Sequence, residues 1–220
     1  MKKKAIVLLS GGQDSTTCLY WAKKNYDEIE GIFFHYSQKH EIEYECAKDI
    51  AKKTSVNLHE FTIPAFKKIG GSSLTNDIKM DDSSKKIPNT FVPGRNIIFL
   101  SYASAVAYKS KITDIIIGVN EEDYSGYPDC RGDFINSMEK SLQLGFEKDI
   151  NIITPLQELS KAGIWKLSDE LGVIDIIKKD THTCYNGDRT TLHDWGYGCG
   201  ECPSCLLRKK GYEEFLMFDV

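Results

Sequence analysis

The stretch from residue 5 to residue 24 carries the residue types best suited to chemistry on a phosphate. An unbroken apolar run, Ala5 to Leu9, leads into the letters SGGQDS at residues 10–15, and residues with helical spacing follow. Two adjacent glycines permit a sharp turn and let backbone N–H groups approach a ligand. We expect Ser15 or Thr16 to cap the following helix, whose positive end would then face the loop. This order of strand, glycine loop and helix predicts a phosphate site.

The letters of this loop exclude two common nucleotide motifs. A Walker A loop needs a lysine directly after its last glycine, but no lysine follows these glycines until Lys23, and the dinucleotide pattern G-x-G-x-x-G is absent. The loop resembles the SGGxDS pyrophosphate loop of the N-type ATP pyrophosphatases, which split ATP between its α and β phosphates. The alternative is a serine-rich turn after a core strand, but the flanking strand and helix favour the pyrophosphate loop.

Four cysteines near the end of the chain have the spacing of a metal site: Cys184, Cys199, Cys202 and Cys205. Four soft ligands in tight turns suit a tetrahedral structural zinc ion. An iron–sulfur cluster is the main alternative, although such runs usually have a further cysteine shortly downstream. His182 and His193 are near enough to replace a ligand, but a solvated loop histidine is the more ordinary expectation.

A second group of polar and aromatic side chains follows later in the chain. Arg95 comes just before a helix that Asn96 can cap. The loop after the strand expected at residues 114–119 contains Tyr124, Tyr127, Asp129 and Arg131. The tyrosines and Asp129 offer stacking and edge hydrogen bonds to a planar base. Arg95 or Arg131 could bind a carboxylate or phosphate in bidentate fashion. Local packing or a surface ion pair is the alternative for each residue.

The elements that must position these residues alternate between strand and helix. We expect strands near residues 5–9, 29–36, 57–63, 114–119 and 151–154, and helices near 16–24, 41–53, 97–109, 133–147 and 161–171. This order predicts an α/β fold, a doubly wound open parallel five-stranded sheet with helices on both faces. Ligands of such sheets lie beyond the carboxyl ends of the strands, where the strand order reverses. The loops after Leu9 and Val119 should therefore meet at the site.

The domain organisation follows from the same patterns. Residues 1–178 should form the ATP-binding catalytic domain, and residues 179–220 a small zinc-binding segment packed on it. From residue 64 to residue 93 the periodicity is lost, and a loop of that length is usually functional. A chain of 220 residues leaves no room for a second catalytic domain.

Composition and charge limit the classes of partner and the cellular location that we expect. The formal net charge of −4 argues against a partner, such as long DNA or a whole tRNA, whose binding depends on the neutralisation of many phosphates. The apolar run after Lys4 is shorter than the ~7 residues of a signal-peptide core, and no later run reaches the ~18 residues of a membrane span. We therefore expect a cytoplasmic protein without nucleic-acid or membrane partners. Its seven cysteines are then more typical of metal ligands or core residues than of disulfides.

Several motifs together resemble the 7-cyano-7-deazaguanine synthase family of the queuosine pathway. They are the glycine loop, residues 91–96, 126–131 and 183–187, and the last three cysteines, so the resemblance extends nearly end to end. It implies an adenine nucleotide alpha hydrolase-like fold, a homodimer, and 7-carboxy-7-deazaguanine, ammonia and ATP as substrates. It also implies zinc on the four cysteines and ATP along Leu8, Leu9, Ser10, Gly11, Gly12, Gln13, Asp14, Ser15, Thr16, Thr17 and Cys18. The spacer between Cys184 and Cys199 is longer than in the shortest family form.

Roles for individual residues complete these expectations. We expect catalysis to involve Asp14, Ser15, Arg95 and Arg131, and Asp14 to help orient Mg²⁺ on the phosphates. Tyr124, Tyr127 and Asp129 are the expected substrate contacts. Two other classes remain open. A tRNA-modifying thiolase or amidase with the same loop would need a basic surface, and a nucleotide-binding regulatory module would need neither a zinc site nor a long substrate loop.

Overall fold

The fold is built on a parallel sheet, as expected. The computed structural model describes residues 2–80, 87–121 and 127–217. Its five-stranded sheet has the order β3-β2-β1-β4-β5, and all neighbouring strands are parallel. The strands are β1 (Lys4–Leu8), β2 (Glu28–His35), β3 (Asn57–Thr62), β4 (Asp114–Ile116) and β5 (Asn151–Ile153). The predicted doubly wound α/β class is confirmed.

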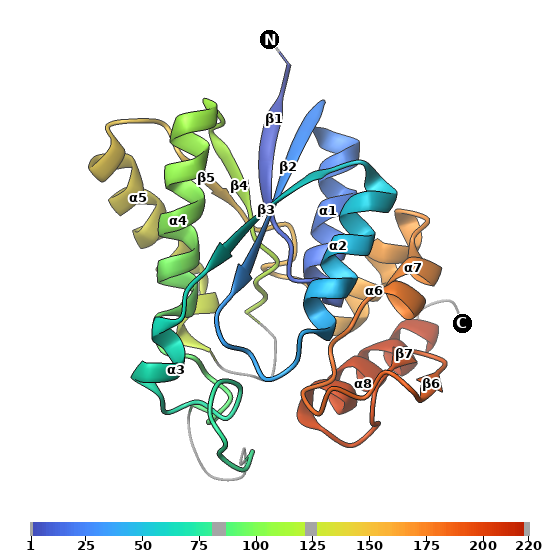
Figure 1. The fold of residues 1–220 in the computed structure, drawn as a ribbon. Helices are drawn as coiled ribbons and strands as arrows, with labels where there is room; N and C mark the ends of the chain where they lie inside the picture. The colour runs from blue at the N-terminus through green and yellow to red at the C-terminus, as the bar shows by residue number, and fades with distance from the viewer. Residues whose placement is uncertain (1, 81–86, 122–126, 218–220) are drawn as a thin grey trace.

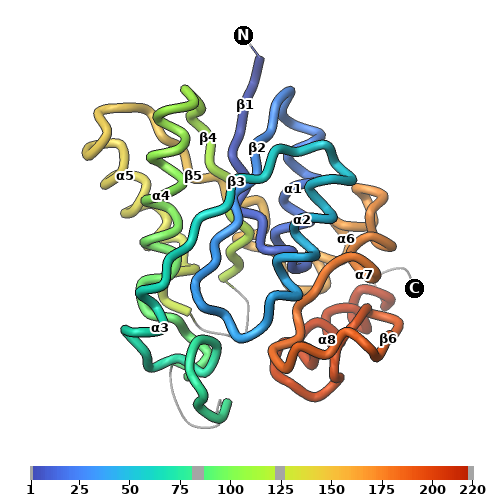
Figure 2. The backbone as a smooth tube through the Cα atoms, viewed as in Figure 1, coloured from blue at the N-terminus to red at the C-terminus, as the bar shows by residue number. Residues whose placement is uncertain are grey.

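Helices cover both faces of this sheet (Figures 1 and 2). One face is covered by α4 (Arg95–Ser110) and α5 (Gly132–Phe146), and the other by α1 (Gln13–Asn25), α2 (Ile42–Thr54) and α6 (Lys161–Glu170). The side chains of β1 alternate between the two cores: Ile6 and Leu8 pack toward α4, whereas Ala5 and Val7 pack toward α1. Both faces of β1 are therefore buried, as its unbroken apolar run predicted.

The strand order reverses between β1 and β4. Chain segments leaving β1 go to β2 and β3 on one side, and those leaving β4 go to β5 on the other. The loops after β1 and β4 consequently lie together at the carboxyl ends of the strands, at the lower end of the sheet in Figure 1. The short helix α3 (Ala65–Ile69) lies near the same end of the sheet.

The end of the chain packs on α6 through a separate core. It contains α7 (Ile174–Asp180), the hairpin of β6 (Leu192–His193) and β7 (Gly196–Tyr197), and α8 (Pro203–Met217). Trp165 of α6 is fully buried against Tyr212 of α8, with ring centroids 5.0 Å apart. The expected boundary after residue 178 falls inside α7 and stays a prediction.

Arg208 of α8 lies inside this third core, where it is 1% exposed. Its guanidinium donates to the carbonyl oxygens of Ile177 (2.6 Å) and Trp195 (2.9 Å) and to Thr183 Oγ1 (2.8 Å). A buried guanidinium needs such partners, because burial of an unpaired charge is strongly unfavourable. Arg208 thus fixes α7, the hairpin and the segment before Cys184 around one side chain.

Two predicted helix caps are wrong. Helix α1 begins at Gln13 with Gly12 as its N-cap, so Ser15 and Thr16 lie inside the first turn. Helix α4 begins at Arg95 after Gly94, whose φ of +76° suits glycine, so Asn96 is also a first-turn residue. In both helices a glycine makes the turn, and neither N-cap has a side-chain hydrogen bond.

Candidate active site

A cavity of about 850 Å³ lies at the carboxyl ends of β1 and β4. One end is lined by the glycine loop, Gly118 to Asn120 and Lys161, and the other by an aromatic group with Arg95 and Glu43. A third wall comes from the end of the chain, including Thr183, Tyr185 and Ser204. This volume is within the range of small-molecule sites. The cavity therefore brings together the loops that the strand order predicted, and adds the metal-binding segment to them.

The glycine loop is held closely against its neighbours. Gly11 has a φ of +81°, and a Cβ placed on it would lie 2.7 Å from the backbone nitrogen of Ala47 in α2. Ser15 Oγ lies 3.1 Å from the backbone nitrogen of Ser10 and 3.2 Å from the carbonyl oxygen of Gly12. Ser15 therefore braces the turn instead of capping the helix. Because α1 has no side-chain cap, no capping side chain occupies its first N–H groups, which suit the binding of an anion such as phosphate.

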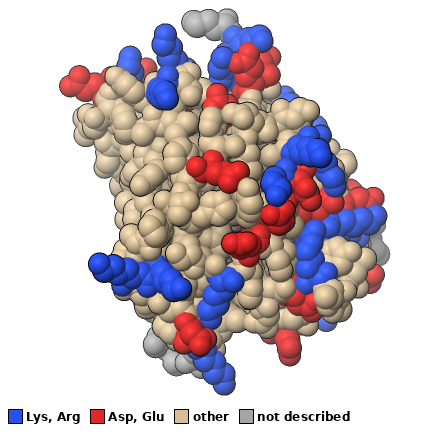
Figure 3. Space-filling view, in the orientation of Figure 1, with Lys and Arg blue, Asp and Glu red and all other residues tan. Residues whose placement is uncertain are grey.

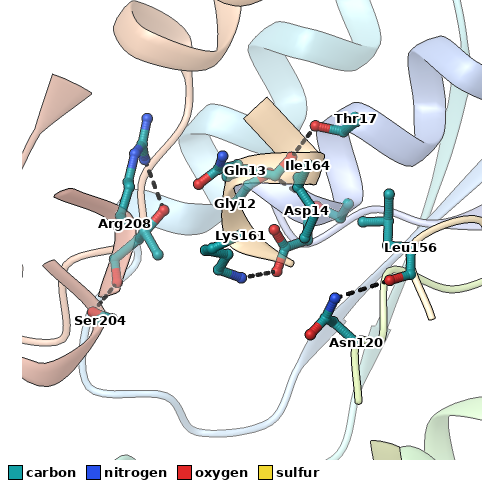
Figure 4. A network of polar contacts seen from close by, with 12 residues as sticks. Gly12, Gln13, Asp14, Thr17, Asn120, Leu156, Lys161, Ile164, Ser204 and Arg208 are labelled. Atoms are coloured by element: carbon teal, nitrogen blue, oxygen red, sulfur yellow. Dashed lines mark hydrogen bonds and ion pairs between the residues drawn. The ribbon is translucent and has the colours of Figure 1, made fainter. Parts of the chain in front are cut away.

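Asp14 forms an ion pair that the sequence did not reveal. Its carboxylate lies 2.8 Å from Lys161 Nζ, and the lysine side chain is only 11% exposed (Figure 4). Lys161 is the first residue of α6, whose N-cap Ser160 accepts from Gly163. A hydrogen bond of 2.9 Å between Thr17 and Ser168 joins the same two helices. The two N-termini and Lys161 concentrate positive charge at the glycine loop.

Residues after β4 fix the opposite side of the loop. Gly118 approaches the backbone of Asp14 so closely that an added Cβ would lie 3.0 Å from its carbonyl carbon. Asn120 is buried and donates from Nδ2 to the carbonyl oxygen of Leu156 at 2.9 Å (Figure 4). It also donates to the carbonyl oxygen of Leu159. This part of the cavity wall is therefore set by backbone contact and a buried amide, with little freedom to move.

Arg95 lies between two aromatic rings at the other end. Its guanidinium carbon is 5.9 Å from the ring centroid of Tyr36 and 5.8 Å from that of Tyr127. Tyr127 is buried and its hydroxyl donates to Thr90 Oγ1 at 2.7 Å. Phe99 completes the group, with its ring centroid 5.6 Å from Tyr36. Flat rings around a fixed cation suit a planar ligand with hydrogen-bond acceptors.

The other expected substrate and catalytic residues are placed differently. Asp129 is buried behind the cavity wall, where its carboxylate accepts from the backbone nitrogen of Asn96 at 3.2 Å and so holds the start of α4. Arg131 is the N-cap of α5, with an exposed side chain outside the cavity lining. Tyr124 lies outside the described residues. Their expected roles in binding and catalysis stay predictions.

Glu43 is a lining residue that sequence reasoning missed. It lies in the first turn of α2 and is half-buried. Burial raises the pKa of its carboxyl to about 7, although the positive charge of Arg95 acts in the opposite direction. Burial and the negative charge of Glu43 raise the pKa of Tyr36 to about 12. No local pattern marks Glu43, because it is one of three glutamates, at positions 41, 43 and 45, around the start of an amphipathic helix.

The four cysteines come together as a candidate metal centre. Their Sγ atoms all lie within 4.8 Å of one another. The pairs Cys184–Cys202 and Cys199–Cys205 are 3.9 Å apart, close to the ~3.8 Å separation that a tetrahedral ion with ~2.3 Å bonds requires. Backbone N–H groups of Cys199 and Cys202 donate to sulfur at 3.4 and 3.3 Å, as expected around thiolates. Donor type and spacing therefore fit one tetrahedral ion.

Neither nearby histidine belongs to this cluster. His193 stacks on Trp195 at 4.4 Å and its Nε2 lies 2.9 Å from the carbonyl oxygen of Gly198. The expectation of a solvated loop residue is wrong for His182, which is 1% exposed. Its backbone N–H donates to the carbonyl oxygen of Gly11 at 3.0 Å. Burial lowers the pKa of its imidazole to about 4, so it joins the metal-binding segment to the glycine loop as a neutral residue.

The long spacer before Cys199 has a clear contact. Arg189 donates to the carbonyl oxygens of Lys179 and Thr181, both at 3.0 Å, at the end of α7. Its guanidinium also lies 5.1 Å from the ring centroid of Tyr197. The spacer thus satisfies carbonyl groups that the helix leaves without partners.

The sheet and its glycine loop define this chain as an α/β protein of the pyrophosphate-loop (PP-loop) class. Solved structures of like fold include a 4-thiouridine synthetase–RNA complex with bound ATP (TM-score 0.54, 21% identity, 80% of this chain and 42% of that chain). Another is NMN synthetase from Francisella tularensis (TM-score 0.50, 19% identity, 80% and 63%). Identities this low show the fold alone.

The chain belongs to the family described as queuosine biosynthesis protein QueC, whose model matches residues 4–216. It is 51% identical to the 7-cyano-7-deazaguanine synthase of Clostridium acetobutylicum over 97% of this chain and 95% of that protein. Identity to the synthase of Bacillus subtilis is 50%, over 98% and 96%. The chain is therefore an enzyme of queuosine biosynthesis. Within its described part, no helix combines the length and apolar character needed to cross a membrane.

Proposed function

We propose that this chain is an ATP-dependent carbon–nitrogen ligase that converts 7-carboxy-7-deazaguanine and ammonia to 7-cyano-7-deazaguanine. The observation that carries the proposal is one continuous cavity, which joins a phosphate loop to an aromatic end containing Arg95. Phosphates at the loop and a planar heterocycle among the rings would place a carboxylate beside the α-phosphate. Holding both reactants in one cavity lowers the entropic barrier to their reaction.

The first half of the reaction makes an amide. A carboxylate is a poor electrophile, so one of its oxygens attacks the α-phosphorus of ATP and releases pyrophosphate. Ammonia then attacks the acyl carbon of this adenylate, AMP leaves with the former carboxylate oxygen, and a proton passes to solvent. The product is 7-amido-7-deazaguanine.

The second half repeats the activation on the amide. Its oxygen attacks the α-phosphorus of a second ATP, its nitrogen loses one proton to solvent, and pyrophosphate again leaves. Loss of AMP and a proton from the adenylated imidate leaves the carbon–nitrogen triple bond. Two ATP molecules are therefore converted to two AMP and two pyrophosphates for each nitrile. Ammonia comes from solution, and both steps use the same cavity.

The phosphates would be held by the residues from Leu8 to Cys18 that the resemblance implied. The N–H groups of α1 around Ser15 and the ammonium group of Lys161 would stabilise negative charge as pyrophosphate leaves. Mg²⁺ bound with ATP would neutralise further phosphate charge, and Asp14 is the carboxylate at the loop that could hold it. Of the two expected arginines, Arg95 lines the cavity, so we assign the acceptor substrate to Arg95 and Tyr127.

We assign zinc to the four-cysteine site, in a structural role. An iron–sulfur cluster would hold four cysteines farther apart than one ion does, and the sulfur separations support a single ion. A closed set of four protein ligands is typical of structural rather than catalytic zinc. The ion would stabilise the wall that Thr183, Tyr185 and Ser204 contribute to the cavity.

We further propose a cytoplasmic homodimer whose substrates are small molecules. The net charge is −4, and acidic and basic side chains are interspersed on the face shown in Figure 3. Both observations favour small-molecule substrates over direct binding of RNA, which depends on a concentrated positive field.

One assay tests the reaction and its main alternative. Synthetic 7-amido-7-deazaguanine with ATP and no added ammonia should yield the nitrile together with AMP and pyrophosphate. Failure to convert the amide contradicts the two-step scheme, and formation of ADP contradicts the pyrophosphate-loop interpretation. Pyrophosphate release that requires free tRNA, and not the deazapurine carboxylate, would establish a tRNA-modifying enzyme instead.

A further inference from the structure

The aromatic end of the cavity contains two opposite charges that do not pair with each other. Arg95 is held between Tyr36 and Tyr127. Glu43 lines the same cavity and is close enough for Arg95 to influence its ionisation. Within the described residues, no hydrogen bond or ion pair reaches the Glu43 carboxylate. A half-buried carboxylate without donors is unfavourable in an empty site, and a ligand with N–H groups would relieve it.

Glu43 is placed there by helix packing rather than by a mobile loop. Its backbone carbonyl lies directly against Gly11, at a distance that only glycine permits. The same close approach brings Ala47 to the loop, and Ala47 is completely buried. Glu43 therefore lies on the side of the aromatic end next to the phosphate loop, on a rigid element. Rigid positioning is what recognition of a ligand edge requires.

The two side chains present a definite order of hydrogen-bonding groups. A guanidinium offers only donors, and an ionised carboxylate offers only acceptors. A planar ligand that satisfies both has an acceptor next to two donors along one edge. The lactam edge of a guanine-type ring has this order: a ring carbonyl, a ring N–H and an exocyclic amino group. An adenine-type edge does not match, because its amino group would face the arginine and its ring nitrogen the carboxylate.

We propose that Arg95 and Glu43 read the lactam edge of the deazaguanine ring, with Arg95 donating to the ring carbonyl and Glu43 accepting from the ring N–H and the amino group. The inference rests on the proposed function and names the residues that give it its base specificity. The phosphates of ATP would then be bound by the glycine loop and Lys161. The same two side chains would prevent the adenine of ATP from binding productively at the aromatic end of the cavity.

The test compares two acceptors on three proteins. The acceptors are 7-carboxy-7-deazaguanine and its analogue without the 2-amino group, and the proteins are wild type, Glu43→Gln and Glu45→Gln. Glu45 is the matched control, since it lies on the same helix but its side chain is 58% exposed and pairs with Lys48. Wild type should prefer the full substrate in kcat/KM by roughly 10- to 100-fold, the value of one bidentate base contact.

Glu43→Gln should raise KM for the deazaguanine substrate at least ~10-fold and reduce the preference over the analogue to about 3-fold or less. Its KM for ATP should change less than about 2-fold, and Glu45→Gln should match wild type. A Glu43→Gln enzyme that keeps the full preference overturns the proposal. An equal rise in the KM for ATP also overturns it, because Glu43 would then contact the nucleotide, for example its ribose hydroxyls.

A binding measurement separates this inference from the reaction itself. Calorimetry with 7-cyano-7-deazaguanine and ATP-free protein should give binding that weakens by a similar factor in Glu43→Gln and stays unchanged in Glu45→Gln. If wild type does not turn over the carboxylate yet shows this pattern, the proposed reaction fails and the edge assignment stands. Equal binding by all three proteins contradicts the edge assignment even if turnover is observed.

Discussion

Glu43→Gln should make the ligand-free protein more stable, and the gain should depend on pH. Burial raises the pKa of Glu43 from 4.5 to about 7 in the folded chain. A carboxyl with a raised folded-state pKa favours folding while it is protonated. Its contribution is fully present below pH 4.5 and is lost as the pH rises through about 7. Glutamine keeps the shape but cannot ionise, so the variant avoids that loss.

The size of the effect follows from the pKa change. Each pKa unit corresponds to about 1.4 kcal/mol, so the rise from 4.5 to about 7 gives an upper limit of about 3.5 kcal/mol. Water in the cavity screens a half-buried carboxylate, which lowers the expected value to about 2 kcal/mol at pH 8. At pH 5 the folded carboxyl is protonated and most of this difference disappears, leaving less than about 1 kcal/mol.

Urea unfolding followed by circular dichroism gives the free energies to compare. Wild type, Glu43→Gln and the exposed control Glu45→Gln are each measured at pH 5 and pH 8 with metal bound and no nucleotide. Differences between variants at one pH cancel the ionisation of all other groups. The reasoning is refuted if Glu43→Gln gains no stability between pH 5 and pH 8 relative to wild type, or if the exposed control gains as much.

The remaining predictions concern the loop, the lysine beside it and the metal. Lys161→Ala or Asp14→Ala should lower kcat at least ~100-fold in a pyrophosphate-release assay with unchanged circular dichroism, because each removes a group at the phosphates; unfolding of either variant would indicate a structural role. Gly11→Ala should destabilise the chain by more than about 2 kcal/mol in urea unfolding, since its Cβ meets the α2 backbone at a positive φ; wild-type stability would contradict that packing. Elemental analysis should find about one zinc per chain, and Cys202→Ser should release it and lower the melting temperature; iron with acid-labile sulfide would disprove the zinc assignment.

Features encoded by neighbouring residues were predictable from the sequence. The order of strand, glycine loop and helix at residues 5–24 is local, so both the phosphate loop and the sheet around it could be inferred. The spacing of Cys199, Cys202 and Cys205 is local as well, and the fold brings Cys184 to them. The sheet class followed because hydrophobic periodicity reports each element without reference to its neighbours.

Features made by contacts between distant residues were not predictable. Lys161 meets Asp14 from 147 positions away, and nothing in its own surroundings marks it. Glu43 becomes distinctive only because Gly11 allows α2 to approach the loop. The wrong helix caps have a related cause: Gly12 and Gly94 make the turns, whereas propensity alone favoured the polar residues just after them.

The contact between His182 and Gly11 has a consequence for how the protein is made. Gly11 precedes His182 by 171 positions, so it is synthesised well before its partner in this contact. The backbone hydrogen bond between them, and the wall that Thr183 and Ser204 add, can form only after the chain has been synthesised beyond residue 204. A chain cut short before residue 182 contains all five strands of the sheet but lacks this hydrogen bond to the glycine loop. Incomplete translation products should therefore be unable to consume ATP.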